Sequence, residues 1–318
     1  MRIAAIPAAV LAVFFATNTG AQEPAFPSRP VRLIVANSAG SPPDNVGRLV
    51  AAKLTEIWGQ QVVVDNRAGA SGLIAAETVA RAAPDGYTLW LPTLTQLIAT
   101  LQSQRYILGK TFAPITLVAG TPHVILANAS LPVKSVAELI AYAKARPGKM
   151  TFGSAGQWGT PHLCMESFMS QAGIEMLHVP YKGSTPAQID LIGGRIDVYC
   201  SASPAVPSMT QTGKVRPLGV TYQKPTALVP GVTPVADTIR GFEVLGWYSL
   251  QAPLATPKRL VARINADMVK ALKSPDLQEK LFALGAEAAP MAPEELAAFL
   301  QRETARWDKI LRQLGGIQ

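Results

Sequence analysis

The sequence predicts an α/β fold with two lobes, each built on a doubly wound sheet, and two strands that cross from one lobe to the other. Short strands rich in Val, Ile and Leu alternate with amphipathic helices along most of the chain, which is typical of largely parallel sheets. Long apolar segments at 114–128 and 245–254 interrupt this alternation. We expect these two segments to be the crossing strands.

Each expected element follows from its local pattern. In the first helix, Val46, Val50 and Leu54 recur at the spacing of one helical face, and Ser135 is a typical first residue for a later helix. Strands are expected at 31–37, 61–66, 87–93, 114–128, 176–181, 195–200, 214–222 and 245–254. Helices are expected at 42–58, about 71–84, 135–145, 257–273, 276–284 and 293–313, with two more that begin at 160 and 185.

The N-terminus has the pattern of a secretory signal peptide at residues 1–21. Arg2 gives the positive start, Ala4–Ala16 the apolar centre, and Thr19-Gly20-Ala21 a small-residue cleavage site. No later segment reaches about 18 uninterrupted apolar residues, the length that a membrane span needs. We therefore expect a soluble, exported protein in the periplasm.

The remaining chain divides into two lobes at the expected crossing strands. The first lobe takes residues 22–120 together with 250–318, and the second takes 121–249. A chain of 318 residues is long enough for two cores of ordinary size.

The formal net charge is +8, from 29 Lys and Arg against 21 Asp and Glu. These cations are scattered along the chain rather than clustered, so a nucleic-acid partner is not expected. A positive surface attracts a small anionic solute. The alternative is a basic surface with no role in ligand binding.

A strand–loop–helix pattern occurs twice, as VRLIVANSAGSPPD at 31–44 and MTFGSAGQWGTPHL at 150–163. Ser41 and Thr160 are expected to cap the two helices, and each is followed by a proline, which is favoured at the first helical position. Asp44 completes a capping-box pattern with Ser41. Because a helix start presents free N–H groups and a positive dipole end, two such starts across a cleft would hold a carboxylate or phosphate.

The chain has two cysteines, Cys164 and Cys200, early in a helix and at the end of a strand. These places lie at the same edge of a parallel sheet, and export makes a disulfide plausible. The alternative is two buried free thiols. A catalytic cysteine is not expected, because no His or Lys is placed to lower its pKa.

The motifs of common enzymes and cofactor sites are absent from the sequence. Gly109-Lys110-Thr111 lacks the first glycine of a phosphate-binding loop, since Gln104 stands there, and neither GxGxxG nor GxSxG occurs. His123, His162 and His178 form no metal-binding pattern. We expect no enzyme, no metal and no cofactor.

Long strings in order give the chain a resemblance to a known family. They include PSRPVRLIV (27–35), VVVDNRAGASG (62–72), APDGYTL (83–89) and HVPYKGSTPAQIDLIGGRIDV (178–198). The chain resembles the Bug-type extracytoplasmic solute receptors of the tripartite tricarboxylate transporter family. This resemblance implies a two-lobed, type II periplasmic-binding-protein (Venus flytrap) fold that binds a small carboxylate and catalyses nothing.

The resemblance also implies a set of ligand-binding residues in three loops and two flanking turns. They are Ser38, Ala39, Gly40, Ser41, Asp44, Thr93, Thr95, Ser154, Gly156, Gln157, Trp158, Gly159, Thr160, Tyr181, Lys182 and Ser201. For Asp44 the alternative is a helix cap, and for Lys182 a solvated charge at the rim. Trp247 and Tyr248 are expected in the hinge core rather than in the pocket.

Three departures from the family pattern bear on specificity. Ala39-Gly40-Ser41 replaces the usual Pro-Gly-Gly, Trp158 replaces a small residue, and Ser201 stands where an acid is frequent. A tryptophan at the pocket mouth suits a flat ligand, and the lost acid removes a partner for an ammonium group. The hypothesis is an aromatic or other non-amino mono- or dicarboxylate, most specifically an acid like terephthalate. The alternative is a citrate-like ligand with Trp158 outside the pocket.

The expected partner is the membrane permease of a tripartite tricarboxylate-type transporter. The receptor, which we expect to be a monomer, would bind this permease in its closed form. Two other classes stay open at this point. One is a sensory receptor that presents its ligand-closed form to a membrane sensor kinase. The other is a periplasmic enzyme acting on a small acid, against which the missing acid–base pair argues.

Overall fold

The computed structural model describes residues 26–316, so the expected signal peptide at 1–21 lies outside the described residues. Strands and helices alternate, as the sequence predicts. The strands are β1 (Val31–Val35), β2 (Val62–Asn66), β3 (Thr88–Leu91), β4 (Phe112–Asn128), β5 (Thr151–Ser154), β6 (Leu177–Pro180), β7 (Val198–Ala202), β8 (Val215–Val220), β9 (Leu245–Pro253) and β10 (Glu287–Ala288).

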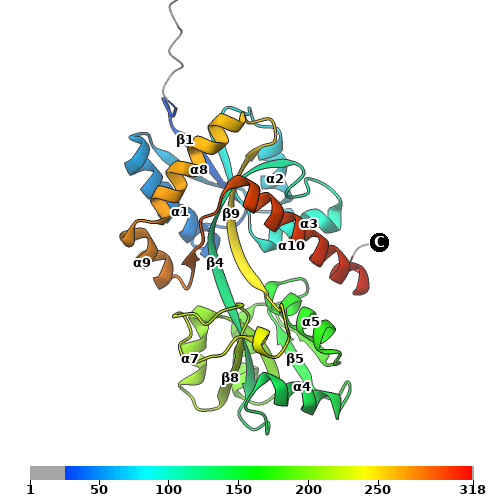
Figure 1. Cartoon of the computed structure of the whole chain (residues 1–318). Coiled ribbons are helices and arrows are strands. Elements are labelled where there is room, and N and C mark those ends of the chain that lie inside the picture. The colour runs from blue at the N-terminus through cyan, green and yellow to red at the C-terminus, as the bar shows by residue number, and fades with distance from the viewer. Residues whose placement is uncertain (1–25, 317–318) are drawn as a thin grey trace, which may run out of the picture.

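The helices surround these strands in two groups, one above the other in Figure 1. They are α1 (Pro42–Trp58), α2 (Leu73–Ala80), α3 (Leu94–Ser103), α4 (Val136–Lys144), α5 (Thr160–Ala172), α6 (Ser184–Ile192), α7 (Val206–Thr210), α8 (Lys258–Leu272), α9 (Pro275–Ala283) and α10 (Pro293–Gln313). Short 3-10 turns lie at Ala70–Gly72, Ser203–Ala205 and Val235–Asp237.

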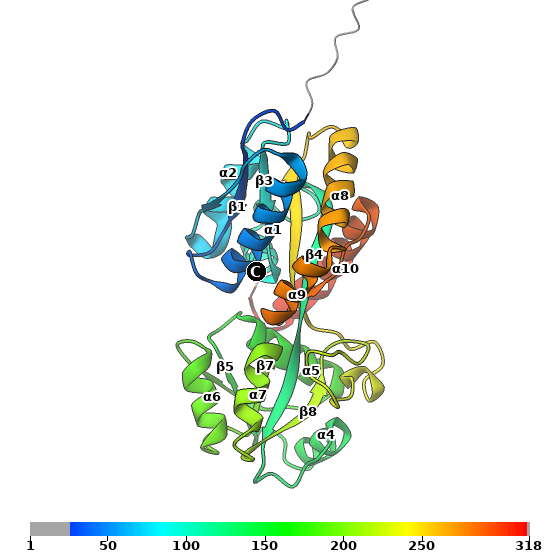
Figure 2. The same ribbon diagram turned by 90° about the vertical axis from the view of Figure 1, so that its left-hand side faces the viewer.

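The upper lobe is built on β1, which pairs in parallel with β2 and β3. Its side chains alternate between two cores, as a strand dictates. Leu33 and Val35 pack in the core shared with α1, α8 and α9, whereas Ile34 packs in the core shared with α2, α3 and α10. Figure 2 shows α1 and α8 side by side on one side of this lobe.

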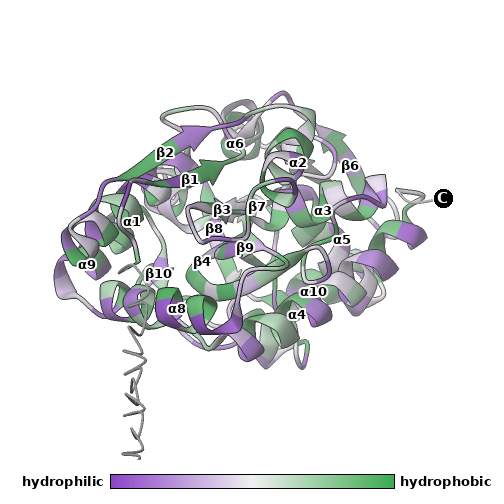
Figure 3. Cartoon of the chain, turned by 90° about the horizontal axis from the view of Figure 1, so that it is seen from above, coloured by the Kyte–Doolittle hydropathy of each residue, from purple (hydrophilic) through white to green (hydrophobic). Residues whose placement is uncertain are grey.

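The lower lobe repeats this plan around β5, which pairs in parallel with β6 and β7. Helices α4 and α5 pack over Ile125 and Phe152 on one face. Helices α6 and α7 pack over Val124 and Leu126 on the other. Both faces of each sheet are therefore covered, and Figure 3 shows apolar residues along the central strands β1 and β4.

Strands β4 and β9 join the two lobes and run antiparallel to one another. From Phe112 to Pro122, β4 pairs with β9; from His123 onward it pairs antiparallel with β7 and β8. All strands belong to one sheet, with β2-β1-β3-β9-β4-β7-β5-β6 as its main path. The two-lobed α/β class with crossing strands is confirmed, but the largely parallel sheet that we expected is in fact mixed.

Helix α10 extends beyond the upper lobe. Its buried Trp307 and Ile310 belong to the same core as Phe168 of α5 and Phe242, which lie in the lower lobe. Arg306 of α10 also donates a hydrogen bond to the backbone carbonyl of Glu243. The C-terminal helix therefore fastens the lobes to each other beside the crossing strands.

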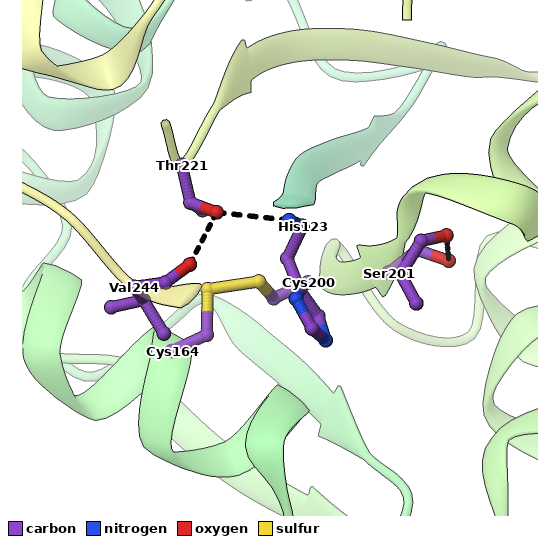
Figure 4. The surroundings of a disulfide bond; sticks show 7 residues. His123, Cys164, Cys200, Ser201, Thr221 and Val244 are labelled. Atoms are coloured by element: carbon purple, nitrogen blue, oxygen red, sulfur yellow. Dashed lines mark hydrogen bonds between the residues drawn. A yellow bond between two sulfur atoms is a disulfide. The ribbon is translucent and has the colours of Figure 1, made fainter. Parts of the chain in front are cut away.

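A disulfide joins Cys164 of α5 to Cys200 of β7, with Cα atoms 6.3 Å apart (Figure 4). Both cysteines are fully buried. The pairing expected from the sequence is confirmed, and the free-thiol alternative is not found. The bridge ties the helix that follows the second Ser-Ala-Gly loop to the sheet of the lower lobe.

Candidate functional site

A cavity of about 450 Å³ lies between the two lobes. The upper lobe contributes the first turns of α1 and α3 and the C-terminal end of α9, and the lower lobe contributes the first turn of α5 and the end of β7. The middle parts of β4 and β9 also line it. This size is ordinary for a site that encloses a small molecule.

Three helix N-termini meet at this cavity, represented by Pro42 of α1, Thr95 of α3 and Thr160 of α5. The first N–H groups of a helix have no partner within it, and the helix dipole places partial positive charge there. No Lys or Arg side chain is found among the described residues that line the cavity. Positive potential in the cavity therefore comes from backbone groups rather than from charged side chains.

The first Ser-Ala-Gly loop leads into α1, but none of its residues 38–41 lines the cavity. Ser38, Ala39 and Gly40 are exposed. Ser41 precedes α1 in extended conformation, and Pro42 stands at the first helical position as expected. The Ser41 hydroxyl, however, donates to the Ser38 carbonyl at 2.6 Å and makes no capping bond to the helix. The expected capping box between Ser41 and Asp44 is therefore wrong, because the Asp44 carboxylate accepts the Gly40 N–H instead of the Ser41 N–H.

Asp44 is buried and organises this loop from within. Its carboxylate accepts hydrogen bonds from the Gly40 N–H at 2.8 Å, the Arg48 guanidinium at 2.9 Å and the Asn66 amide at 2.9 Å. Burial acts to raise the pKa of Asp44, but the hydrogen bonds from Arg48, Gly40 and Asn66 outweigh it and hold the pKa below its ordinary value. Asp44 does not line the cavity, which favours its interpretation as a structural cap.

The same contacts reduce the number of N–H groups that α1 offers to a ligand. The Gly40 N–H is taken by Asp44, and the Ser41 N–H donates to the Ser38 carbonyl. Pro42 and Pro43 carry no N–H. The first helix therefore contributes mainly its dipole.

The loop after β3 begins α3 with a complete capping box. Thr93 donates its N–H and hydroxyl to the Gln96 side chain, and its hydroxyl accepts from the Thr95 N–H. Thr93 is buried and Thr95 is exposed, yet both line the cavity. Thr93 and Thr95 are therefore two predicted site residues that a ligand in the cavity would contact.

The second Ser-Ala-Gly loop reaches the cavity through Thr160. The structure places Gly159 at the capping position and Thr160 as the first residue of α5, so the expected cap is one residue off. Ser154 is buried behind the loop, where its hydroxyl lies 2.7 Å from His178 Nε2. Ser154, Gly156, Gln157 and Gly159 shape the loop without lining the cavity.

Two stacked imidazoles support this loop from behind. His162 and His178 lie with ring centroids 4.1 Å apart, and His162 Nδ1 accepts the Trp158 N–H at 3.2 Å. Burial, with a smaller effect of His162, lowers the pKa of His178 to about 4. His178 is therefore neutral near pH 7, and both rings act as structural supports.

Trp158 lies outside the cavity. Its indole packs edge-on against His162, with ring centroids 5.5 Å apart, and a Cβ on Gly316 would come within 2.6 Å of the indole. The residue has a left-handed backbone, with φ of 64°. Trp158 therefore connects the second loop to the segment that follows α10.

The remaining predicted residues also lie away from the cavity. Tyr181 donates its hydroxyl to Asp190 at 2.7 Å, and its N–H donates to the Ser154 carbonyl. Lys182 is exposed, and Ser201 is buried in β7 with its hydroxyl directed to the Ala202 carbonyl. Tyr181 and Ser201 thus support the second loop and the sheet, and Lys182 carries a solvent-exposed charge.

Several cavity residues were not predicted from the sequence. Thr121 and His123 of β4 and Trp247 and Tyr248 of β9 line it, because the crossing strands form its back wall. The available signal was the polar Thr-Pro-His interruption of the apolar segment 114–128. We expected Trp247 and Tyr248 in the hinge core rather than in the pocket, but both lie on crossing strand β9 and line the cavity.

Apolar residues complete the wall between the lobes. They are Ala202 and Pro204 of the lower lobe and Ala283 and Leu284 at the end of α9. Ser203 donates its hydroxyl to the Gly285 carbonyl at 3.2 Å, so the two lobes already touch here. Both polar and aliphatic groups therefore line the cavity.

Residues 26–316 contain no group of His, Cys, Asp or Glu side chains arranged to hold a metal ion. Within the same range, no helix has both the length and the apolar composition needed to cross a membrane.

Comparison with known proteins identifies relatives over nearly the whole chain. The family described as "Tripartite tricarboxylate transporter family receptor" matches residues 46–316. Protein BugT of Bordetella pertussis is 32% identical over 316 residues, which cover 96% of this chain and 97% of BugT.

Two solved structures are informative because their ligand states differ. Rpa4515 of R. palustris with adipate is 34% identical and superposes with a TM-score of 0.71, covering 91% of this chain and 98% of that one. A TctC solute-binding protein from Polaromonas with no ligand is only 27% identical, covers 91% and 99%, and yet reaches 0.83. The overall superposition is therefore closer with the ligand-free protein than with the adipate-bound one.

Proposed function

We propose that this chain, which belongs to the tripartite tricarboxylate transporter receptor family, captures a small carboxylate between its lobes and delivers it to a transporter permease. The protein is a solute-binding receptor of the periplasmic type and not an enzyme. The observation that carries the proposal is the meeting of Pro42, Thr95 and Thr160, three helix starts from two lobes, at one cavity.

The binding step follows from the charge distribution in the cavity. A carboxylate that accepts hydrogen bonds from backbone N–H groups gains charge-assisted strength, more so where water is excluded. The first turns of α3 and α5 line the cavity from opposite lobes, through Leu94 and Thr95 and through Thr160. A ligand held by both would be bound best when the lobes approach each other.

Closure of the lobes is the second step that we propose. A hinge at the crossing strands β4 and β9 would let the lower lobe rotate toward the upper one. The higher TM-score with the ligand-free Polaromonas protein than with the adipate-bound protein supports an open starting form. We also propose that the lobes divide as 22–120 with 250–318, and 121–249, close to the change of β4 partner after Pro122.

For the ligand, we propose an aliphatic dicarboxylate rather than an aromatic acid stacked on tryptophan. The indole of Trp158 packs on His162 and Gly316, which supports the alternative in which it lies outside the pocket. The adipate in a relative that is 34% identical supports the same class. The protein would act in the periplasm after removal of residues 1–21, as a monomer.

The experiment is a calorimetric and thermal-shift screen of the exported protein with succinate, adipate, citrate, terephthalate and inorganic phosphate. A ligand at a hundredfold excess over its Kd should stabilise the protein by about 2.7 kcal/mol. Scattering measurements should show a smaller radius of gyration for the same complex. If no carboxylate bound, or if binding left the radius unchanged, the capture-and-closure proposal would be wrong.

A further inference from the structure

His123 of β4 lies in the back wall of the cavity with its side chain almost fully enclosed. It is 5% exposed, and its Nδ1 atom is buried without a hydrogen-bond partner. Buried polar atoms in proteins are nearly always paired, because an unpaired one loses its hydrogen bonds to water without replacement. An unpaired ring nitrogen at the wall of a ligand cavity therefore needs an explanation.

The backbone around His123 is fixed by hydrogen bonds, so the position of the ring is well defined. The His123 N–H donates to Thr221 Oγ1 at 2.9 Å, and that hydroxyl donates to the Val244 carbonyl at 2.6 Å. Figure 4 shows this chain of hydrogen bonds and the His123 ring near the disulfide between α5 and β7. The site is built in advance of any ligand.

We infer that His123 is a specificity-determining residue whose ring N–H donates a hydrogen bond to a second oxygen of the bound acid. This inference rests on the proposed function, since it assumes that a carboxylate of the same solute is held at the helix starts. It names the class of solute as an acid with two oxygen-bearing groups, such as a dicarboxylate or a hydroxy or keto acid.

The protonation state of the ring supports a donor role without a charge. Burial lowers the pKa of His123 to about 4, and the nearby Thr121 backbone carbonyl acts to raise it, although the geometry completes no hydrogen bond to Nδ1. The ring is therefore neutral near pH 7, and a neutral imidazole has one N–H donor and one acceptor nitrogen. A neutral donor binds an oxygen atom without a buried ion pair and its cost of desolvation.

Thr121 adds a second polar group to the same part of the wall. It lies two residues before His123, so both side chains stand on one face of β4, and both line the cavity. Its hydroxyl is buried close to that of Tyr248, but the geometry completes no hydrogen bond. Two incompletely paired groups on one strand face make a polar patch in the back wall of the cavity.

This arrangement predicts strong discrimination between matched acids. A site built to hydrogen-bond an oxygen rejects an analogue that lacks it, because the buried donor then stays unpaired. We expect a dicarboxylate to bind at least tenfold more tightly than the monocarboxylate of equal carbon number. The pairs to compare are succinate with butyrate, adipate with hexanoate, and terephthalate with benzoate.

The test uses calorimetry on the wild type and on His123→Leu and His123→Asn, since the asparagine amide can donate from the place of Nδ1. The comparison uses the pair whose dicarboxylate binds best. His123→Leu should lower the affinity for this dicarboxylate by about tenfold or more and leave the affinity for the monocarboxylate unchanged. His123→Asn should keep most of the preference. Equal affinities in wild type and His123→Leu, or an equal loss for both acids, would overturn the inference.

A second measurement needs only the wild-type protein and remains decisive if a variant does not fold. In protein labelled with nitrogen-15 at histidine, the Nδ1 resonance of His123 should move on addition of the dicarboxylate and not of the monocarboxylate. Binding without that change would contradict the role of His123 while leaving the proposed function intact. If none of the acids bound at all, the proposed function itself would fail.

Discussion

The indole Nε1 of Trp247 donates a hydrogen bond to Glu303 Oε2 at 3.3 Å, and this contact joins crossing strand β9 to the C-terminal helix α10. Trp307 donates to the same oxygen at 3.2 Å, and Arg306 forms an ion pair with the carboxylate at 2.8 Å. Trp247 also lines the ligand cavity. The buried carboxylate therefore fixes the hinge strand at the point where the strand meets the ligand.

Replacement of Glu303 should destabilise the protein more than replacement of an exposed glutamate. Glu303→Ala would leave Arg306 without its counter-charge and two buried indoles without an acceptor, a loss of about 3–5 kcal/mol by analogy with other buried ion pairs. Urea unfolding measures this loss of stability. Glu279→Ala, in exposed sequence of α9, is the control and should change stability by less than about 0.5 kcal/mol. Equal midpoints for the two variants would show that the cluster contributes nothing.

Loss of the disulfide should lower stability by about 4 kcal/mol, the chain-entropy value for a closed loop of 36 residues. The chain has no other cysteine, so a reductant acts on this bond alone. Urea unfolding with and without reductant measures the loss, and Cys164→Ala/Cys200→Ala is the control that should not respond. A wild-type midpoint that stays the same after both thiols have been freed would contradict the prediction.

The pH dependence of stability should depend on His123. Its folded pKa of about 4 lies below the ordinary value of 6.5, so the fold disfavours protonation. Stability from the neutral ring is fully present above pH 6.5 and is lost as the pH falls toward 4. Between pH 7 and pH 5 the wild type should lose about 2 kcal/mol more than His123→Asn. Parallel pH profiles in urea unfolding would show that the ring is not buried as described.

Trp158→Ala should leave the affinity for terephthalate within about twofold of the wild type, because an aromatic contact is worth about 1 kcal/mol only where the rings meet. The indole lies against His162 and Gly316 instead of lining the cavity. Gln157→Ala, an exposed neighbour in the same loop, is the control. Calorimetry that gave a tenfold loss for Trp158→Ala alone would restore the stacking hypothesis.

The sequence predicted the fold class and the disulfide because both leave local signals. Apolar periodicity marks strands and helices, and the strand–loop–helix pattern places Cys164 and Cys200 at one edge of a sheet. The direction of β4 and β9 leaves no such signal, since a fully buried strand looks the same in either direction. The antiparallel pairing of the crossing strands was therefore missed.

The candidate site was predicted in part. Thr93, Thr95 and Thr160 line the cavity because a helix start after a strand marks the ligand edge of an α/β sheet. His123 and Trp247 escaped prediction because they come from distant strands that meet only in the folded chain. Ser154 and Asp44 carry polar groups in the right loops, yet their side chains serve the loops themselves.

Hydrogen exchange of the exported protein with its best-binding dicarboxylate tests most directly whether helix starts from both lobes hold one solute. Backbone amides at 93–96 in the upper lobe and at 160–163 in the lower lobe should exchange more slowly together when the ligand is added. Slower exchange in only one lobe, with binding established by calorimetry, would contradict a carboxylate clasped between the two.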